Sequence, residues 1–186
     1  MSAGRYRTIV ADPPWPVSRP GGWSTNAANR PQSYPTMSVE AISALPVDEI
    51  AAASAWLFVW TVNAYVESCY AVVKAWGFRP VTLLTWCKTP RGVGPGSAFP
   101  TTTEFILFAR RGQEGLGHLR LTDSSWFTWP RRGQSVKPEA FLDLIESGFP
   151  APRLEMFARR QRLGWDTWGN EALEHVTLGA AGAVDE

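Results

Sequence analysis

The hydrophobic residues of this chain gather in short runs, separated by stretches rich in Pro, Gly, Ser and Asn. Several runs are continuously apolar, which is the pattern of strands that are buried on both faces of a parallel sheet. They predict strands over residues 8–11, 55–61, 80–88, 104–110 and 154–159.

Other segments show the spacing of a helix that buries one face. Apolar residues recur in this way over residues 65–76, with Asn63 as an N-cap and Gly77 at the end. Shorter helices are expected after Ser38 and at Pro46. Strands that alternate with helices predict right-handed crossovers and a mostly parallel sheet with helices on both faces.

The composition fits one globular domain. The chain has 186 residues, of which 45% are hydrophobic and 19% are charged. We expect a single domain over residues 1–175 and a frayed tail over residues 176–186, which are small and acidic. No apolar run approaches the roughly 20 residues of a membrane span. The start of the chain lacks the apolar core of a signal peptide. These features predict a cytoplasmic protein.

The cysteines and histidines are too sparse for a metal site. Cys69 and Cys87 lie in apolar segments and form no Cys-x-x-Cys pair. We expect both to be reduced and buried, as in cytoplasmic proteins. Because His118 and His175 are the only histidines, the sequence predicts no structural zinc.

The charges predict a local surface for nucleic acid. The net charge is +1, so the molecule as a whole is not a basic binder. Most basic residues are Arg, which forms bidentate contacts with phosphate, and pairs stand at 110–111, 131–132 and 159–160. No pattern assigns residues 112–134. Trp126 and Trp129 in that stretch are either anchors or substrate contacts, with core packing as the default interpretation.

Two polar segments predict long loops. Residues 16–37 are rich in Pro, Gly, Ser and Asn, and we interpret them as a flap over a functional site. Residues 89–103 are rich in Gly, Pro and Thr. Their glycines at 92, 94 and 96 do not match a dinucleotide-binding loop, because the third comes one residue early and no helix follows.

The strand over residues 8–11 ends abruptly on Asp12-Pro13-Pro14-Trp15. Proline lacks a backbone N–H and has a fixed φ, so the prolines cannot continue the strand. Asp12 is therefore expected at the carboxyl end of a strand, where ligands bind in open α/β sheets. Its carboxylate and a free proline carbonyl can accept hydrogen bonds from an amino group. Trp15 can stack on the ring that carries the amine.

This tetrad resembles the signature of the amino-methyltransferases that act on the exocyclic amine of adenine or cytosine. Its Asp…Trp form is similar to the branch that contains the catalytic subunit of the messenger-RNA adenosine methyltransferase and its bacterial and phage relatives. In that family a Tyr-x-Thr-Met segment closes over the target base, and residues 34–37 match it. The resemblance implies that the tetrad is catalytic and that Trp15 and Tyr34 bind the base.

A second group of motifs begins at Lys137. Pro138 fits the first turn of a helix that places Phe141, Leu142 and Ile145 on its inner face. Lys137 is therefore expected beside the free N–H groups of a helix N-terminus, which attract a carboxylate or a phosphate.

The family holds S-adenosylmethionine with Lys-Pro-acidic, Glu-x-Phe-x-Arg and Trp-x-x-x-Gly-Asn-Glu/Gln motifs, and all three recur here in that order. The resemblance implies that Lys137 pairs with the methionine carboxylate. It implies further cofactor contacts from Asp12, Glu155, Arg159, Arg160, Gln161, Asn170 and Glu171. Residues 160–162 read Arg-Gln-Arg where the family has Pro-His-Asn, so the chain departs from the family pattern at these positions.

The order of the motifs along the chain also bears on the fold. The catalytic turn precedes the cofactor strand, so the resemblance implies a single-domain, circularly permuted Rossmann-like methyltransferase fold. A Trp-x-Lys-Thr motif at residues 86–89 also matches the family. Glu104 opens the next strand and is expected at a sheet edge, as a substrate contact.

The implied function is S-adenosylmethionine-dependent methylation of the N6 amine of adenine in nucleic acid, with DNA ranked before RNA and no metal or membrane involved. Asp before the prolines, rather than Ser, favours adenine over cytosine. The alternatives are an RNA adenine or DNA cytosine-amine methyltransferase, an inactive nucleic-acid-binding partner subunit, and an unrelated α/β enzyme such as a nucleotide hydrolase. The intact motifs disfavour the inactive partner, and the lack of a phosphate loop disfavours the hydrolase. A homo- or hetero-oligomer is left open.

Overall fold

The computed structural model describes residues 5–16, 35–89, 98–113, 121–133 and 136–169. Tyr34, Asn170, Glu171 and the tail over residues 176–186 lie outside these ranges. One seven-stranded sheet runs through the described part, in the order β5-β3-β4-β2-β1-β6-β7. The strands are β1 (Tyr6–Ala11), β2 (Ala51–Thr61), β3 (Arg79–Cys87), β4 (Thr103–Arg111), β5 (Trp126–Phe127), β6 (Arg153–Met156) and β7 (Asp166–Trp168).

All neighbouring strands pair in parallel except at β4, which is antiparallel to both β2 and β3. The carboxyl ends of the other strands therefore share an edge with the start of β4. Asp12 follows the end of β1, and Glu104 is the second residue of β4. The reversed direction of β4 thus brings two acids that are far apart in sequence to one edge.

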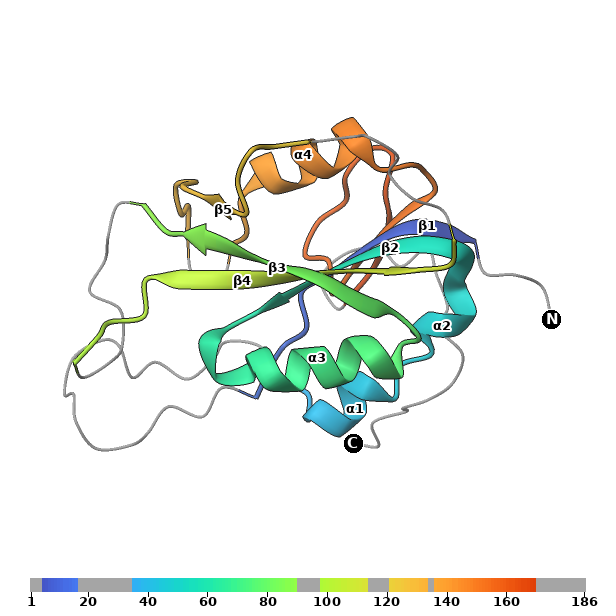
Figure 1. Ribbon diagram of the computed structural model, residues 1–186, viewed down its shortest axis with the longest axis horizontal. Helices are drawn as coiled ribbons and strands as arrows, with labels where there is room; N and C mark the ends of the chain where they lie inside the picture. The colour runs from blue at the N-terminus through green and yellow to red at the C-terminus, as the bar shows by residue number, and fades with distance from the viewer. Residues whose placement is uncertain (1–4, 17–34, 90–97, 114–120, 134–135, 170–186) are drawn as a thin grey trace.

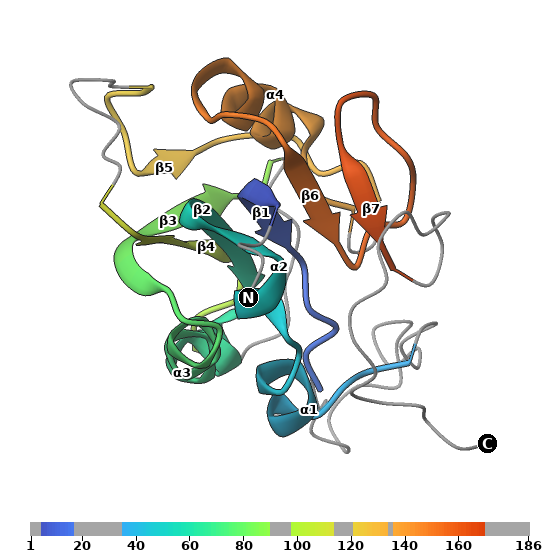
Figure 2. The same ribbon diagram turned by 90° about the vertical axis from the view of Figure 1, so that its right-hand side faces the viewer.

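Helices cover both faces of the sheet (Figures 1 and 2). They are α1 (Val39–Ser43), α2 (Val47–Ile50), α3 (Val66–Ala75) and α4 (Glu139–Gly148). Helices α1 and α3 pack on one face, where Ile42, Cys69 and Val72 join the buried side chains of the strands. Helix α4 packs on the other face through Phe141, Leu142 and Ile145, against an aromatic layer from β2.

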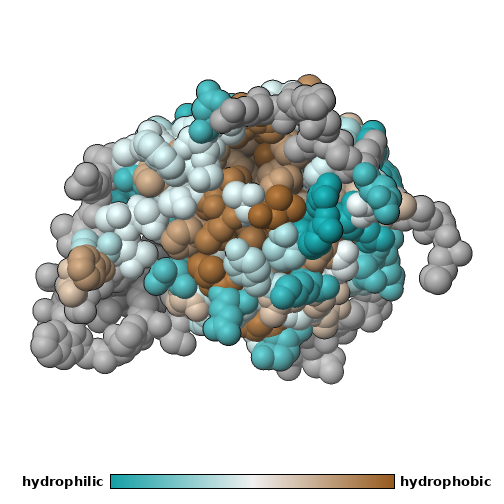
Figure 3. Space-filling view, in the orientation of Figure 1, coloured by the Kyte–Doolittle hydropathy of each residue, from teal (hydrophilic) through white to brown (hydrophobic). Residues whose placement is uncertain are grey.

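The two faces differ in how completely they are covered. Helix α4 lies over β1 and β2, whereas the residues of β3 are mostly exposed or half-buried. Apolar surface therefore remains open in the middle of the view below α4 (Figure 3). Trp56, Val81 and Phe108 line a hollow at the end of this surface where β3 begins.

The described fold confirms the predicted α/β class with a mostly parallel sheet, and the motif-bearing strand β6 lies beside β1. Ser38 caps α1 by accepting a hydrogen bond from the N–H of Ala41 at 3.1 Å. Gly77 ends the α3 region at a φ of +78°, a conformation that suits glycine. Asn63 is not a cap: it opens a short 3-10 helix, and Tyr65 precedes α3.

Two short strands were not predicted. Residues 166–168 form β7 although no strand was expected there, and β5 lies in the unassigned stretch over residues 112–134. Strands of two or three residues carry too little alternation to stand out in a sequence. Cys69 and Cys87 are free thiols, with Cys69 buried and Cys87 half-buried. Within the described ranges, no helix is long and apolar enough to span a membrane.

Candidate active site at the carboxyl edge of the sheet

The Asp-Pro-Pro turn leaves β1 as expected, but its carbonyls are not free. The carbonyl oxygen of Pro13 accepts the N–H of Trp15 at 2.8 Å, and that of Pro14 accepts the N–H of Met37 at 3.0 Å. The expectation of free carbonyls is therefore wrong. A carbonyl oxygen has two lone pairs, so each can accept one further hydrogen bond.

Trp15 lies in the core rather than on an open surface. Its side chain is 4% exposed, and its ring stacks on Tyr65 at 5.5 Å. Its indole N–H donates to the carbonyl of Trp60 at 2.9 Å. A base cannot stack on a ring that is already covered, so the stacking role expected for Trp15 does not agree with this packing. The indole instead anchors the Pro-Pro turn.

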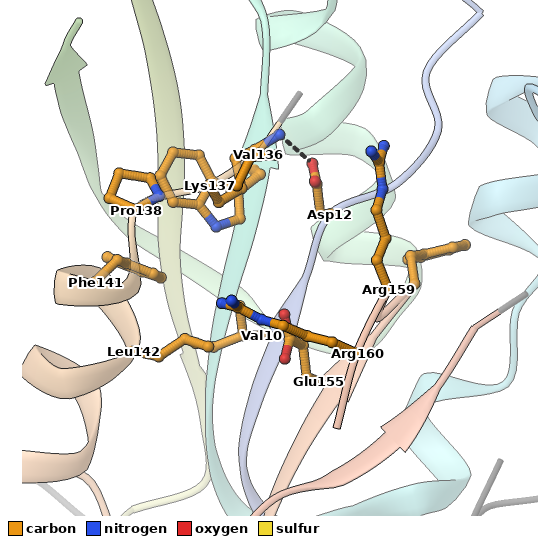
Figure 4. A pocket seen from close by; sticks show the side chains of 12 residues that line it. Val10, Asp12, Val136, Lys137, Pro138, Phe141, Leu142, Glu155, Arg159 and Arg160 are labelled. Carbon is orange, nitrogen blue, oxygen red and sulfur yellow. Dashed lines mark ion pairs between the residues drawn. The ribbon is translucent and has the colours of Figure 1, made fainter. Parts of the chain in front are cut away.

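Four alternating charges connect Asp12 to β3. The Nζ atom of Lys137 lies 2.8 Å from Oδ1 of Asp12 and 3.4 Å from Oε2 of Glu104. On the far side of Glu104, Nζ of Lys88 lies 2.5 Å from Oε1. Figure 4 shows the Lys137 side chain pointing at Asp12. Lys137 is therefore shared between two carboxylates, and Lys88 balances the second.

This arrangement fixes the direction in which each pKa moves. Burial raises the pKa of Asp12, and the attraction of Lys137 only partly offsets that effect. Burial would also raise the pKa of Glu104, but Lys137 and Lys88 outweigh it and hold that pKa below its ordinary value. Burial would lower the pKa of Lys137, but Asp12 and Glu104 outweigh it and raise that pKa. Lys137 therefore stays cationic.

A cavity opens between this cluster and α4 (Figure 4). Its apolar wall comes mainly from β1, β2 and α4, and its charged residues come from the strand ends and from the segment before α4. The lining residues are Val10, Asp12, Trp60, Val136, Lys137, Pro138, Phe141, Leu142, Glu155, Phe157, Arg159 and Arg160.

Glu155 is the charged group in this wall without a full set of partners. Its Oε2 atom is buried and has no hydrogen-bond partner among the residues that the structure describes. Burial, and then the negative charge of Asp12, raise the pKa of Glu155 to about 7. A buried acceptor without a donor is costly, so this oxygen points to a ligand that brings a hydroxyl or amine.

The chain bends sharply after Glu155. Strand β6 ends at Met156, and Phe157 has a φ of 62°, a left-handed conformation that is costly for an aromatic residue. The bend turns Arg159 and Arg160 back to the cavity (Figure 4). Arg160 forms an ion pair with Glu139 at the start of α4.

Arg162 fastens the same segment to α4. Its guanidinium lies 3.1 Å from Glu139, 2.5 Å from Asp143 and 2.6 Å from Glu146. These acids lie on one face of α4, at positions that repeat every three or four residues. That spacing was visible in the sequence, but its partner was not, because Arg162 lies beyond the next strand.

The structure thus places five of the predicted site residues around one cavity: Asp12, Lys137, Glu155, Arg159 and Arg160. Glu104 joins them through Lys137. Gln161 is exposed and does not line the cavity. Lys88 and Arg162 were not predicted as site residues. Among the described residues, no group of His, Cys, Asp and Glu is arranged to hold a metal ion.

A permuted α/β sheet with an Asp-Pro-Pro-Trp turn at the mouth of such a cavity defines the class of amino-methyltransferases. Comparison with known proteins gives the family. The MT-A70 family model matches residues 6–171, so the chain belongs to the MT-A70 family.

Named relatives include enzymes of different kinds. The chain is 29% identical to the type II methyltransferase M.MunI of a Mycoplasma species, over 98% of this chain and 84% of that protein. It is 26% identical to the N(6)-adenine-specific methyltransferase METTL4 of Mus musculus, over 91% of this chain and 38% of that protein. It is 27% identical to the N6-methyladenosine RNA methyltransferase MTA1 of Pyricularia oryzae, over 93% of this chain and 48% of that protein.

Proposed function

We propose that this protein transfers a methyl group from S-adenosylmethionine to the N6 amine of adenine in DNA, with Asp12 as the residue that orients the amine. The observation that carries the proposal is the position of Asp12. It stands where β1 gives way to the Pro-Pro turn, at the rim of the cavity, and is held there by Lys137 at 2.8 Å.

The residues around the cavity fit S-adenosylmethionine. Lys137 precedes the N-terminus of α4 and suits the methionine carboxylate. The unpartnered oxygen of Glu155 suits the ribose hydroxyls. Arg159 and Arg160, with Gln161, Asn170 and Glu171 by family resemblance, are proposed for the adenosine side. When bound, the cofactor supplies a methyl group on a positively charged sulfur.

We propose that Asp12 overcomes the main chemical obstacle to methyl transfer. The lone pair of an exocyclic amine is delocalised into the ring, so the nitrogen is planar and a poor nucleophile. Hydrogen bonds from its two N–H groups to the Asp12 carboxylate and to the second lone pair of the Pro13 carbonyl favour a pyramidal nitrogen. The same carboxylate stabilises the positive charge that develops there. Lys137 keeps the carboxylate in place.

The target base needs other contacts than Trp15. A base in a duplex must leave the stack, at a cost of a few kcal/mol. We propose that Trp15 holds the Pro-Pro turn rigid, since it is stacked on Tyr65. Tyr34 lies outside the described residues, and its contact with the base stays a prediction. Glu104 remains a proposed substrate contact because it lies beside Lys137.

DNA is preferred because of the similarity to a type II methyltransferase. The chain is 29% identical to M.MunI and 27% identical to the RNA methyltransferase MTA1. RNA is the alternative substrate. We propose one methyltransferase domain over residues 1–175 and, from two free cysteines, a reducing cytoplasmic compartment. A homo- or hetero-oligomer is compatible with this function.

The first test replaces Asp12. Lys137 keeps Glu104 as a partner, so Asp12→Ala should fold and should still bind S-adenosylmethionine in calorimetry. Its turnover on adenine-containing DNA should fall by about 100- to 1000-fold, as for the loss of one preorganised transition-state partner.

The control is Asp48→Ala, which removes an exposed acid elsewhere and should leave turnover unchanged. Normal turnover in Asp12→Ala would refute the assignment of Asp12. Wild-type protein that binds no cofactor would instead indicate an inactive binding subunit.

A further inference from the structure

Trp126 differs from every other tryptophan in the described residues. Its side chain is 57% exposed, whereas the others are buried or half-buried. No hydrogen bond or ring contact of its indole is found within the described ranges. Only its backbone N–H is engaged, by the Ser124 hydroxyl at 3.1 Å.

The neighbouring aromatic residues explain the contrast. Side chains alternate between faces along a strand, so Trp126 and Phe127 of β5 point in opposite directions. Phe127 stacks on Trp129 at 4.3 Å with the rings 3° from parallel. The carbonyl of Trp129 accepts the indole N–H of Trp86 at 2.8 Å. These rings anchor β5 on the α4 face, and Trp126 is left on the outer side.

Two exposed arginines follow Trp126 in the chain, and one exposed acid, Asp123, precedes it. The N–H of Arg131 donates to the carbonyl of Thr89 at 3.0 Å, which places the chain after β5 beside the end of β3. Arg131 and Arg132 are exposed, whereas Lys88, one residue before Thr89, is already paired with Glu104. An exposed aromatic ring followed by exposed arginines is a combination that binds single-stranded nucleic acid, which offers bases for stacking and phosphates for ion pairs.

The pairing of the strands gives the distance from Trp126 to Asp12 along the carboxyl edge of the sheet. Trp126 pairs with Thr85, and Thr85 pairs with Phe105, next to Glu104. Neighbouring strands are about 4.8 Å apart, so Trp126 lies about 10 Å from β4. Two further strand spacings lead to β1 and Asp12. The whole distance is therefore about 19 Å. A stacked strand rises about 3.4 Å per nucleotide, so a base on Trp126 would lie about five or six nucleotides from the target.

We propose that Trp126 is a stacking platform for an unpaired base of the substrate strand, about five or six nucleotides from the adenine that is methylated. This inference rests on the proposed function. Phe127 and Trp129 hold the platform in place, and Arg131 and Arg132 bind the phosphates beside it.

The test pairs protein variants with abasic oligonucleotides. The wild type, Trp126→Ala and Trp126→Phe bind single-stranded DNA with one adenine, and then a series in which one base near that adenine is removed at a time. Affinity is measured by fluorescence anisotropy, which needs no turnover. Val81→Ala, at the other end of β3 and 49% exposed, is the matched control.

Trp126→Ala should raise the Kd for intact DNA by about 5- to 150-fold, the range that corresponds to stacking of about 1–3 kcal/mol per base. Trp126→Phe should keep most of the affinity, and Val81→Ala all of it. At one position of the series, removal of the base should weaken the wild type by the same factor and leave Trp126→Ala unchanged. The Kd for cofactor should not change in any variant.

Equal affinity of wild type and Trp126→Ala for intact DNA would overturn the platform. A loss in Trp126→Ala that is equal at every abasic position would overturn it too, because no single base would then depend on the indole. Methylation of the same DNA by the wild type tests the proposed function separately. If the wild type methylates only RNA of the same sequence, the binding measurements are repeated with the matching abasic RNA series, and the same outcomes support or overturn the platform.

Discussion

Glu155 couples the folding of this protein to pH. Its carboxyl has an ordinary pKa of 4.5, and burial raises that pKa to about 7 in the folded protein. Between these values the folded state holds a proton that the unfolded chain has released. The contribution of the protonated Glu155 carboxyl to the free energy of unfolding is therefore complete below pH 4.5. It is lost as the pH rises through about 7.

Glu155→Gln should remove this dependence. Between about pH 5 and pH 8 the Tm of the wild type should fall relative to that of the variant, by about 2–4 °C for each kcal/mol of linkage. Glu146→Gln is the control. Hydrogen bonding to Arg162 lowers the pKa of Glu146, so its contribution is lost only in acid, below this window. A constant difference in Tm between wild type and Glu155→Gln would contradict the linkage.

Single residues also mark the limit of inference from the sequence. Asp12 and Lys137 could be placed because local rules act on them: prolines end a strand, and a proline opens a helix. The burial of Trp15 could not, because it depends on Tyr65 and Trp60, which come from other elements. The role of its ring in binding the base therefore stays a prediction.

The pairing of β3 with β4 lets Lys88 act on Asp12 without touching it. Lys88→Met would leave Glu104 with Lys137 as its only cation, and the carboxylate would then draw Lys137 away from Asp12. We expect kcat to fall about 5- to 30-fold, which corresponds to a coupling of about 1–2 kcal/mol. Lys88→Arg should retain most of kcat.

A double-mutant cycle tests whether Lys88 acts on Asp12 through Glu104. In Glu104→Gln the partner charge is absent, so adding Lys88→Met should lower kcat little further. Thermal unfolding of each variant shows whether stability changes in parallel. The proposed coupling fails if Lys88→Met costs the same in both backgrounds.

The length of a strand determined whether it could be predicted from the sequence. Strands of nine or eleven residues, such as β4 and β2, were evident from their apolar runs. The antiparallel direction of β4 was not, because an apolar run carries no direction. Only that direction brings Glu104 to the edge where Asp12 lies.

For the whole molecule, a net charge of +1 means that nucleic acid must be held locally. Arg131 and Arg132 are exposed at the catalytic edge. On duplex DNA, each phosphate that a cation neutralises adds about 0.9 to the slope of log Kd against log salt. Replacing both arginines with Gln should therefore make that slope shallower by about this amount for each phosphate they bind.

Arg79 and Arg110 provide the matched control pair. They face each other across β3 and β4 at the opposite edge of the sheet, so replacing both with Gln should leave the salt dependence unchanged. The reverse pattern, with the slope altered only by the second pair, would move the binding surface to that edge.

The four charges from Lys88 to Asp12 also bear on how fast each ligand arrives. Two cations and two carboxylates cancel one another beyond a distance of about 10 Å. Long-range attraction speeds an encounter only where charge is left unbalanced. The contribution of these four charges to the rate at which cofactor meets its cavity should therefore change little with ionic strength. The arrival of nucleic acid at the exposed arginines should slow as salt rises. In a cell that gains salt, the enzyme would therefore keep its bound cofactor but would find adenine more slowly.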